Sequence, residues 1–380
     1  MVLHMVVSTV DEKCIVELEK RLKQKIPEAR FVNEQAVGVM FNSKREVVGL
    51  SLHGCSLDEF PAPVLELKSL KILYLVDNRL KLLPGDIYRL ESLQKLDLWK
   101  NQLQSLPESI GNLKQLKKLY LTGNEKAGDE EIVQGNTIAK LPDTIGNLAS
   151  LELLHLANNR LTGLPSSFGN LSNLKNLYLQ DNLIEKLPSS FGALKGLQVL
   201  DLSKNDLKSL PDSFCDLASL EQLLLGKNEL RALPDAFGKL QVKELDLNGN
   251  KIGALPASLL GIKELKTLNV SKNGLTSFPG PLSTLDSLRV LDASQNLLVV
   301  IPELPVSIQT IELYKNRITS LPEMLKSLPD LKHVEIVNNP LGPGSKELMA
   351  TLKDKGVDTG LYFATVKKPE ENPFDQPGNV

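Results

Sequence analysis

Most of this chain is built from one sequence unit that recurs every 23 residues, and this period constrains the fold more than any other feature. The unit is clearest at residues 93–113, which read L-x-x-L-x-L-x-x-N-x-L-x-x-L-P-x-x-I-G-x-L. A single copy cannot bury its own leucines, so consecutive copies must stack against one another. The period therefore predicts that the 380 residues form one elongated solenoid with a continuous core.

The first part of each unit predicts a short strand that ends at an asparagine. In the unit at 93–113, Leu96 and Leu98 alternate with Asp97 and Trp99, so the leucines point inward and the other two point outward. Asn101 follows, where its amide can both donate to and accept from backbone groups left unpaired by a sharp bend. The outward positions of successive strands form a readable surface.

The second part of the unit returns the chain along the opposite side of the solenoid. We expect Pro107 to exclude a regular helix there, and Ile110 and Leu113 to anchor this convex side. Thirteen repeat strands are predicted, which begin at Val47, Leu70, Leu93, Leu116, Leu151, Leu174, Leu197, Leu220, Val242, Leu265, Leu288, Ile308 and Leu331.

The turn asparagine recurs in every repeat except the first. It is expected at Asn78, Asn101, Asn124, Asn159, Asn182, Asn205, Asn228, Asn250, Asn273, Asn296, Asn316 and Asn339. The first repeat has Cys55 at this position, which we interpret as a small, buryable substitute for asparagine rather than as a redox sensor.

Two irregularities interrupt the period. The step from Leu116 to Leu151 is 35 residues, which predicts an inserted acidic loop at 125–136, with Asn136 as a second candidate for the turn asparagine. The step from Leu288 to Ile308 is only 20 residues, because a short segment at 301–305 replaces the longer convex part.

Both ends of the solenoid are predicted to be capped. Residues 1–46 form an N-terminal cap, with a helix that begins at a capping box of Thr9 and Glu12, ends before Pro27 and precedes a β-hairpin. A helix for binding a partner is the alternative, although an open solenoid end needs a polar lid. Residues 47–341 form the repeat domain. Residues 342–366 form a C-terminal cap whose helix is N-capped by Ser345 and stops at Gly356, and 367–380 form a disordered tail.

Composition bounds the kind of partner. The 44 basic and 46 acidic residues nearly cancel, which favours a discrete protein partner over nucleic acid or an anionic membrane. The three cysteines lie far apart, without the clustered flanks that staple the ends of secreted repeat proteins, and this indicates a reducing compartment. We find no basic leader and no apolar run of membrane-spanning length. We therefore expect a monomeric cytoplasmic protein without a cofactor.

The motif L-P-x-x-I/F-G-x-L, as in residues 106–113 and 141–148, resembles that of the intracellular leucine-rich repeat proteins of the Ras-signalling and Scribble type. The related plant intracellular group shares it, and the short repeat at 301–305 is similar to the 20-residue class of bacterial effectors. The resemblance implies an α/β fold: a curved leucine-rich repeat horseshoe with a parallel concave β-sheet. It also implies a non-catalytic scaffold in intracellular signalling, whose concave face often holds GTPases or phosphatases.

Aromatic and apolar residues gather among the outward positions of five adjacent strands. Aromatic side chains suit strands in general, but that preference predicts no clustering. Interfaces concentrate such residues, because they bury large areas and keep a polar group. We therefore predict a protein-binding surface at Ile72, Tyr74, Val76, Trp99, Tyr120, Leu153, His155 and Tyr178.

The same outward position becomes acidic in the second half of the array. The acidic residues are Asp201, Asp246, Asp292, Glu312 and Glu335. Strands lie about 4.8 Å apart, so carboxylates two strands apart stand roughly 9–10 Å from each other and do not readily share one calcium ion. A solvated strand edge and a role in steering a basic partner are both open, and no metal site is predicted.

Catalysis is not expected. A hydrolase on the concave face is the first alternative, but His155 and Asp201 lie two strands apart, beyond the roughly 2.6–3.2 Å reach of a catalytic pair. The chain has no G-x-S-x-G motif, phosphate-binding loop or metal-spaced histidine pair. The second alternative, end-to-end structural assembly, is opposed by the polar caps.

Overall fold

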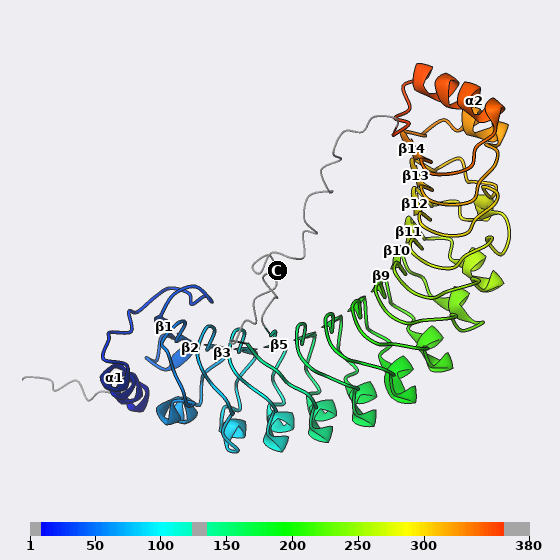
Figure 1. The fold of residues 1–380 in the computed structure, drawn as a ribbon. Helices are drawn as coiled ribbons and strands as arrows, with labels where there is room; N and C mark the ends of the chain where they lie inside the picture. The colour runs from blue at the N-terminus through cyan, green and yellow to red at the C-terminus, as the bar shows by residue number, and fades with distance from the viewer. Residues whose placement is uncertain (1–8, 124–134, 361–380) are drawn as a thin grey trace, which may run out of the picture.

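The fold is a curved solenoid, described by a computed structural model for residues 9–123 and 135–360. The thirteen predicted repeat strands line the inner side of the curve and follow one another in chain order as parallel neighbours (Figure 1). One further strand, β1 (Gly38–Phe41), pairs with the first repeat strand in the antiparallel sense. The sheet therefore has 14 strands in the order β1 to β14.

The repeat strands are short, and each three-residue strand contributes one inward-pointing leucine, isoleucine or valine flanked by outward residues. They are β2 (Val47–Ser51), β3 (Ile72–Tyr74), β4 (Lys95–Asp97), β5 (Lys118–Tyr120), β6 (Leu153–His155), β7 (Asn176–Tyr178), β8 (Val199–Asp201), β9 (Gln222–Leu224), β10 (Glu244–Asp246), β11 (Thr267–Asn269), β12 (Val290–Asp292), β13 (Thr310–Glu312) and β14 (His333–Glu335).

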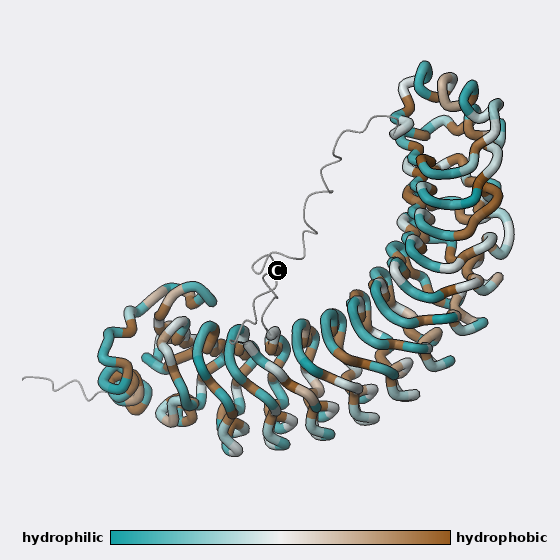
Figure 2. Tube along the Cα trace, in the orientation of Figure 1, coloured by the Kyte–Doolittle hydropathy of each residue, from teal (hydrophilic) through white to brown (hydrophobic). Residues whose placement is uncertain are grey.

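The core runs the length of the array as the period predicts. Leu96 and Leu98 are fully buried, and so are their counterparts in the middle of the array, Leu200 and Leu202. Hydrophobic and hydrophilic residues alternate around every turn of the chain (Figure 2). One contiguous hydrophobic cluster extends from Cys14 to Val357, so the stacked repeats share a single core.

A ladder of asparagine side chains joins each repeat to the one before it. The Asn101 Nδ2 atom donates to the Leu75 and Leu98 carbonyls at 2.8 and 3.0 Å, while its Oδ1 atom accepts from the Leu80 N–H at 3.0 Å. The removal of one such buried amide leaves backbone groups unpaired and costs roughly 1–3 kcal/mol. The same pattern recurs at Asn78, Asn159, Asn182, Asn205, Asn228, Asn250, Asn273, Asn296, Asn316 and Asn339.

The insertion lies earlier in its repeat than we predicted. Asn136 takes the place in the ladder, because its Oδ1 atom accepts from the Leu103 N–H at 3.0 Å and its Nδ2 atom donates to the Leu98 carbonyl at 2.9 Å. The expected turn asparagine, Asn124, and most of the acidic loop lie outside the described residues. The extra residues therefore precede the turn asparagine rather than follow it.

The convex side carries a short 3-10 helix in most repeats, where we expected no regular helix. Pro107 caps η3 (Glu108–Asn112), because a proline is tolerated at the start of a helical turn. A Cβ atom at Gly111 would lie 2.2 Å from the Thr144 carbonyl oxygen, so glycine is required for the next repeat to stack this closely. The others are η1 (Ala62–Glu66), η2 (Ile87–Arg89), η4 (Asp143–Asn147), η5 (Ser166–Asn170), η6 (Ser189–Ala193), η7 (Asp212–Asp216), η8 (Phe237–Lys239), η9 (Ala257–Gly261), η10 (Leu282–Thr284) and η11 (Glu323–Ser327).

The N-terminal end is covered by α1 (Val10–Leu22) and by the hairpin of β1 and β2. Thr9 and Glu12 form the predicted capping box, and Ile15 and Leu18 are buried against the first repeats. The segment between α1 and β1 lies on the concave side of the curve (Figure 1).

The C-terminal end is covered by α2 (Pro343–Asp354). Its N-cap is Gly342 and not Ser345 as predicted, because Pro343 already fits the first helical position and Ser345 is buried inside the first turn. The helix is followed by Gly356 in a left-handed conformation with φ of +84°. The predicted tail at 367–380 lies outside the described residues.

Cys55 occupies the asparagine position of the first repeat, as the spacing predicts. Its half-buried thiol donates to the His53 carbonyl at 3.6 Å and accepts from the Gln24 amide at 3.2 Å. Burial raises the pKa of this thiol above its usual value, although the Gln24 hydrogen bond partly opposes the shift. All three cysteines, Cys14, Cys55 and Cys215, are free thiols.

Candidate functional site

The outward residues of the repeat strands form regular columns on the concave face. The register pairs Tyr74 with Asp97, then Tyr120, His155 and Tyr178 on consecutive strands. The eight residues of the predicted binding surface thus lie on or directly after the adjacent strands β3 to β7. The register is kept even across the 35-residue step between β5 and β6.

Three of these side chains stack on one another, and we call Tyr120, His155 and Tyr178 the aromatic row. The ring centroids of Tyr120 and His155 lie 6.4 Å apart with an interplanar angle of 25°. Those of His155 and Tyr178 lie 4.8 Å apart at 23°. The row is only partly buried and has a tyrosine at each end.

The middle ring of the row is uncharged at neutral pH. Burial lowers the pKa of His155 from 6.5 to about 4, so the imidazole remains neutral. Its Nδ1 atom shares a hydrogen bond of 2.8 Å with the Thr122 hydroxyl, which fixes the plane of the ring. Burial also raises the pKa of the Tyr178 phenol, which therefore stays protonated.

Lys95 extends the row toward the N-terminal strands. Its ammonium nitrogen lies 4.8 Å from the ring centroid of Tyr74 and 4.9 Å from that of Tyr120. Burial acts to lower the pKa of Lys95, but a hydrogen bond with Tyr74 and the nearby Tyr120 and Asp97 raise it overall. The lysine therefore stays charged and links two aromatic rings that are not on neighbouring strands.

Asp97 lies on the floor between Tyr74 and Tyr120 and is only 7% exposed. Its Oδ1 atom accepts from the Trp99 N–H at 3.1 Å. Burial raises the pKa of Asp97 from 3.8 to about 6, although this hydrogen bond and Lys95 act in the opposite direction.

Part of the predicted surface is not available to a partner in this structure. Tyr74 and Val76 are 6% and 1% exposed, because Val32 from the N-terminal cap packs on them. Ile72, Trp99 and Met40 pack partly buried around this small cluster. The prediction treated every outward residue as accessible, but the sequence pattern of the repeats contains no information about a segment that folds over them.

The accessible part of the surface is correspondingly smaller. Leu153 is 8% exposed and forms floor beside the aromatic row. Trp99 is only partly buried and has the Lys100 ammonium 4.5 Å from the centroid of its ring. Trp99 and the aromatic row therefore remain as the accessible aromatic residues of strands β4 to β7.

The acidic column has a structural role that we did not predict. Asp201, Asp246 and Asp292 each accept a hydrogen bond of 2.9 Å from the backbone N–H two residues further along. The amide oxygen of Asn269 accepts in the same way at 3.0 Å. The repeated spacing of an aspartate or asparagine two residues before a small polar residue was the available sequence signal.

The acidic column is also unpaired. Within the described part of the chain, no lysine or arginine forms an ion pair with Asp201, Asp246, Asp292, Glu312 or Glu335. Burial raises the pKa of Asp201, Asp246 and Glu312, and neighbouring carboxylates add to the shift. Among residues 9–123 and 135–360, no group of three or more potential ligands is arranged to hold a metal ion.

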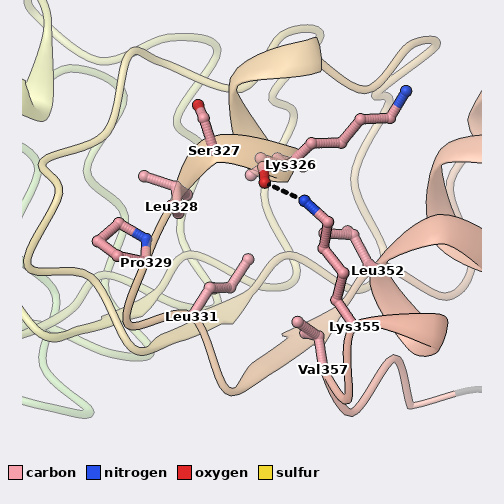
Figure 3. Close-up of a pocket in the computed structure, with 9 residues that line it drawn as sticks. Lys326, Ser327, Leu328, Pro329, Leu331, Leu352, Lys355 and Val357 are labelled. Carbon is pink, nitrogen blue, oxygen red and sulfur yellow. Dashed lines mark hydrogen bonds between the residues drawn. The ribbon is translucent and has the colours of Figure 1, made fainter.

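A separate pocket of about 280 Å³ lies at the C-terminal end, between η11 and α2 (Figure 3). Aliphatic side chains and polar groups both line it, and the Lys355 ammonium group donates to the Lys326 carbonyl at 2.7 Å. The lining residues are Leu325, Lys326, Ser327, Leu328, Pro329, Leu331, Leu352, Lys355 and Val357. The pocket is a gap in the packing of the cap on the last repeat, far from the aromatic row.

None of the helices in the described residues is long and apolar enough to cross a membrane. Among the described residues, the His155 side chain has one hydrogen bond, with Thr122, and no carboxylate of that part of the chain bonds to it.

Comparison with protein families supports the fold directly. A model described as "Leucine rich repeat" matches residues 66–125, 132–184 and 240–298, and a model described as "Leucine-rich repeat region" matches residues 168–242. Together the matches cover more than half of the chain, which belongs to the leucine-rich repeat proteins. Comparison with curated protein sequences gives no match.

Solved structures with the same fold come from several kinds of organism. A leucine-rich repeat protein of Leptospira interrogans is 28% identical over 82% of this chain and 94% of that chain, with a TM-score of 0.53. The ectodomain of the Arabidopsis thaliana receptor kinase GASSHO1/SCHENGEN3, in complex with Casparian strip integrity factor 2, is 28% identical over 84% of this chain, with a TM-score of 0.58. The match covers 45% of that ectodomain. An internalin of Listeria monocytogenes is 18% identical over 94% of this chain and 98% of that chain, with a TM-score of 0.66, and shows the fold alone.

These matches define the class of the protein. Leucine-rich repeat proteins are generally scaffolds that bind other proteins, and the matching families indicate no enzyme.

Proposed function

We propose that this chain is a non-catalytic scaffold that binds a protein on the concave face of its repeat domain, residues 47–341, between the two caps. The observation that carries the proposal is the aromatic row, in which three rings from three adjacent strands stack at the surface. Tyrosine and tryptophan are enriched among the residues that dominate binding energy at interfaces.

The electrostatics of the row favour a protein partner. Its middle ring is neutral, its ends are phenols, and Lys95 is already paired with two rings. Such a surface combines large apolar area with hydrogen-bonding groups and little net charge, as the centre of a protein interface does. The unpaired acidic column of the second half then has a secondary role, in which it steers a basic part of the same partner.

The resemblance to Ras-signalling and Scribble-type proteins extends the proposal to an intracellular scaffold for a GTPase or a phosphatase. Three free thiols, two of them buried, support a reducing compartment such as the cytoplasm. The receptor ectodomain among the similar structures represents the opposite location, so the compartment needs its own test by imaging of the tagged chain in its native cell.

Affinity capture from the native cell tests the binding surface. Replacement of both Tyr120 and Tyr178 by alanine should lower the affinity for the captured partner at least roughly tenfold, because two anchor side chains are lost. The matched control is Tyr88→Ala, which removes an exposed tyrosine from η2 on the convex side. Unchanged capture by the double variant, together with loss of capture by Tyr88→Ala, would place the interface on the convex side instead.

A further inference from the structure

A short segment of the N-terminal cap lies over the first strands of the concave face, and we call residues 30–37 the strap. Just before the strap, Glu28 forms an isolated β-bridge with Val39 of β1, which fixes this end of the segment. Within the strap only Val32 is buried, whereas the neighbouring Phe31 is 72% exposed. Val32 is therefore the side chain that anchors the strap to the concave face, while Val37 at its end packs, partly buried, against the main core.

Few polar contacts hold the strap. Within the described residues, the only hydrogen bond that involves it runs from the Gln35 N–H to the Asn33 Oδ1 atom at 3.0 Å, inside the strap itself. Segments with few buried apolar contacts and no hydrogen bonds to the rest of the fold open at low free energy.

Val32 fills a small slot on the concave face that exists because residue 49 is a glycine. The floor of the slot contains Gly49, where an added Cβ atom would lie 2.8 Å from Val32 Cγ2 and 3.1 Å from Met40 Cε. Val32 packs on Tyr74 and Val76, which form one wall of the slot. Trp99 packs against this cluster. The absence of a side chain at Gly49 thus creates the space that accepts a branched aliphatic side chain.

Two polar side chains that follow Gly49 on the same face of the chain are unsatisfied. The Ser51 Oγ and His53 Nδ1 atoms are buried without a hydrogen-bond partner, and both residues alternate with Gly49 on the same side of the chain. Ser51 is fully buried. Buried polar groups without partners are costly, so an occupant that offers hydrogen bonds would fit this slot better than the strap does.

The strap also brings a negative charge, Glu34, near the buried carboxyl group of Asp97. Asp97 has a raised pKa mainly because of burial, and Glu34 from the strap contributes to the shift through like-charge repulsion. Displacement of the strap would relieve this repulsion and expose Tyr74 and Val76 next to Trp99.

We propose that the slot around Gly49 is a peptide-binding subsite, and that the strap occupies it within the same chain until a partner displaces Val32. The partner that fits is an extended protein segment with a small branched aliphatic side chain and free backbone groups that reach Ser51 and His53. This inference rests on the proposed function, because it assigns the subsite to the same concave face. A tethered occupant competes at an effective concentration in the millimolar range, so the strap sets a threshold that the partner must exceed.

Trp99 allows a test without the native partner, because it is the only tryptophan of the chain and packs beside the slot. In the full chain, Val32→Ser should release the strap and increase the quenching of Trp99 fluorescence by acrylamide. Phe31→Ser, which changes an exposed residue of the same strap, should leave the quenching unchanged. Equal quenching in the wild type and in Val32→Ser would overturn the proposal.

Binding of a synthetic peptide with the sequence of residues 28–37 identifies the occupant. The Val32→Ser chain, with its slot open, should bind this peptide at least roughly tenfold more tightly than the wild-type chain, whose own strap competes. A peptide in which serine replaces Val32 should not bind. Equal affinity of the two chains, or of the two peptides, would contradict the subsite.

Gly49→Ala gives a second variant that keeps the strap sequence intact. The added methyl group should expel Val32 and raise the quenching of Trp99, yet it should also fill the slot and prevent binding of the peptide. Peptide binding by Gly49→Ala would overturn the proposed geometry. These readouts do not use the native partner, so they separate failure of the subsite from failure of the aromatic row to bind that partner.

Discussion

The two halves of the concave face use the same strand position for different purposes. In β5 to β7 it holds Tyr120, His155 and Tyr178, whose rings contact each other. In β8, β10 and β12 it holds Asp201, Asp246 and Asp292, whose carboxylates bond to their own backbone. The aromatic side chains of the first half are free to contact a partner. In the second half, the three carboxylates use part of their hydrogen-bonding capacity to stabilise their own strand ends. An acidic column on a repeat surface is therefore not in itself a sign of a binding site.

The largest effects should be equal in the two halves, because they share one core. Leu156→Ala beside the aromatic row and Leu202→Ala beside the acidic column each remove a fully buried side chain and should each cost roughly 2–5 kcal/mol of unfolding free energy. Lys195→Ala on the surface should cost little. Chemical denaturation measures all three, and a loss confined to one half would mean that the halves differ in their packing and not only in their surface.

The second prediction concerns pH. The folded pKa of Asp97, about 6, exceeds its ordinary value of 3.8, so its contribution to stability is present below about pH 4 and is lost as the pH rises through 6. The folded pKa of His155, about 4, lies below 6.5, so its contribution is present above pH 6.5 and is lost as the pH falls toward 4. Each shift corresponds to roughly 3 kcal/mol, and the two oppose each other across the same range.

Asp97→Asn should therefore reveal the pH dependence of stability that comes from His155. This variant keeps an acceptor for the Trp99 N–H, gains stability at neutral pH and becomes less stable as the pH falls from 6.5 to 4. His155→Gln should show the opposite slope. Urea unfolding across this pH range measures both, and identical profiles for the two variants would show that these groups do not control the response.

The smallest predicted effect concerns Asp201 and tests whether the outward strand position stabilises the fold in the second half of the array. Asp201→Ala removes the acceptor of the Ser203 N–H and should cost about 1 kcal/mol, whereas Asp201→Asn should cost much less because an amide oxygen can still accept. Thermal melts of the two variants provide the measurement. If asparagine were as damaging as alanine, the charge of the column rather than its hydrogen bond would be the stabilising feature.

The sequence predicted the repeat frame well, because one constant period determines the strand register and the buried leucines. Asn124 and Asn136 fitted the spacing equally well, however, and only the hydrogen bonds of Asn136 to Leu98 and Leu103 distinguish them. The cover over Tyr74 and Val76 could not be predicted, because Val32 lies in a segment without any period and reaches them through tertiary packing. The binding surface itself remains a prediction.

The asparagine ladder also has a direction, which makes the two ends of the array chemically unequal. Every asparagine of the ladder accepts from and donates to the preceding repeat. The first repeat has no preceding repeat for an amide to hold, and its Cys55 thiol bonds instead to His53 and to Gln24 of the cap. The last repeat has the opposite need, since no later asparagine accepts from its Leu341 N–H, which bonds to the Asn339 carbonyl at 2.9 Å instead. In this ladder a shortened front end needs a substitute for one asparagine side chain, whereas a shortened rear end leaves a backbone donor that a new local bond must satisfy. Each shortened end also needs a polar cap over its exposed core.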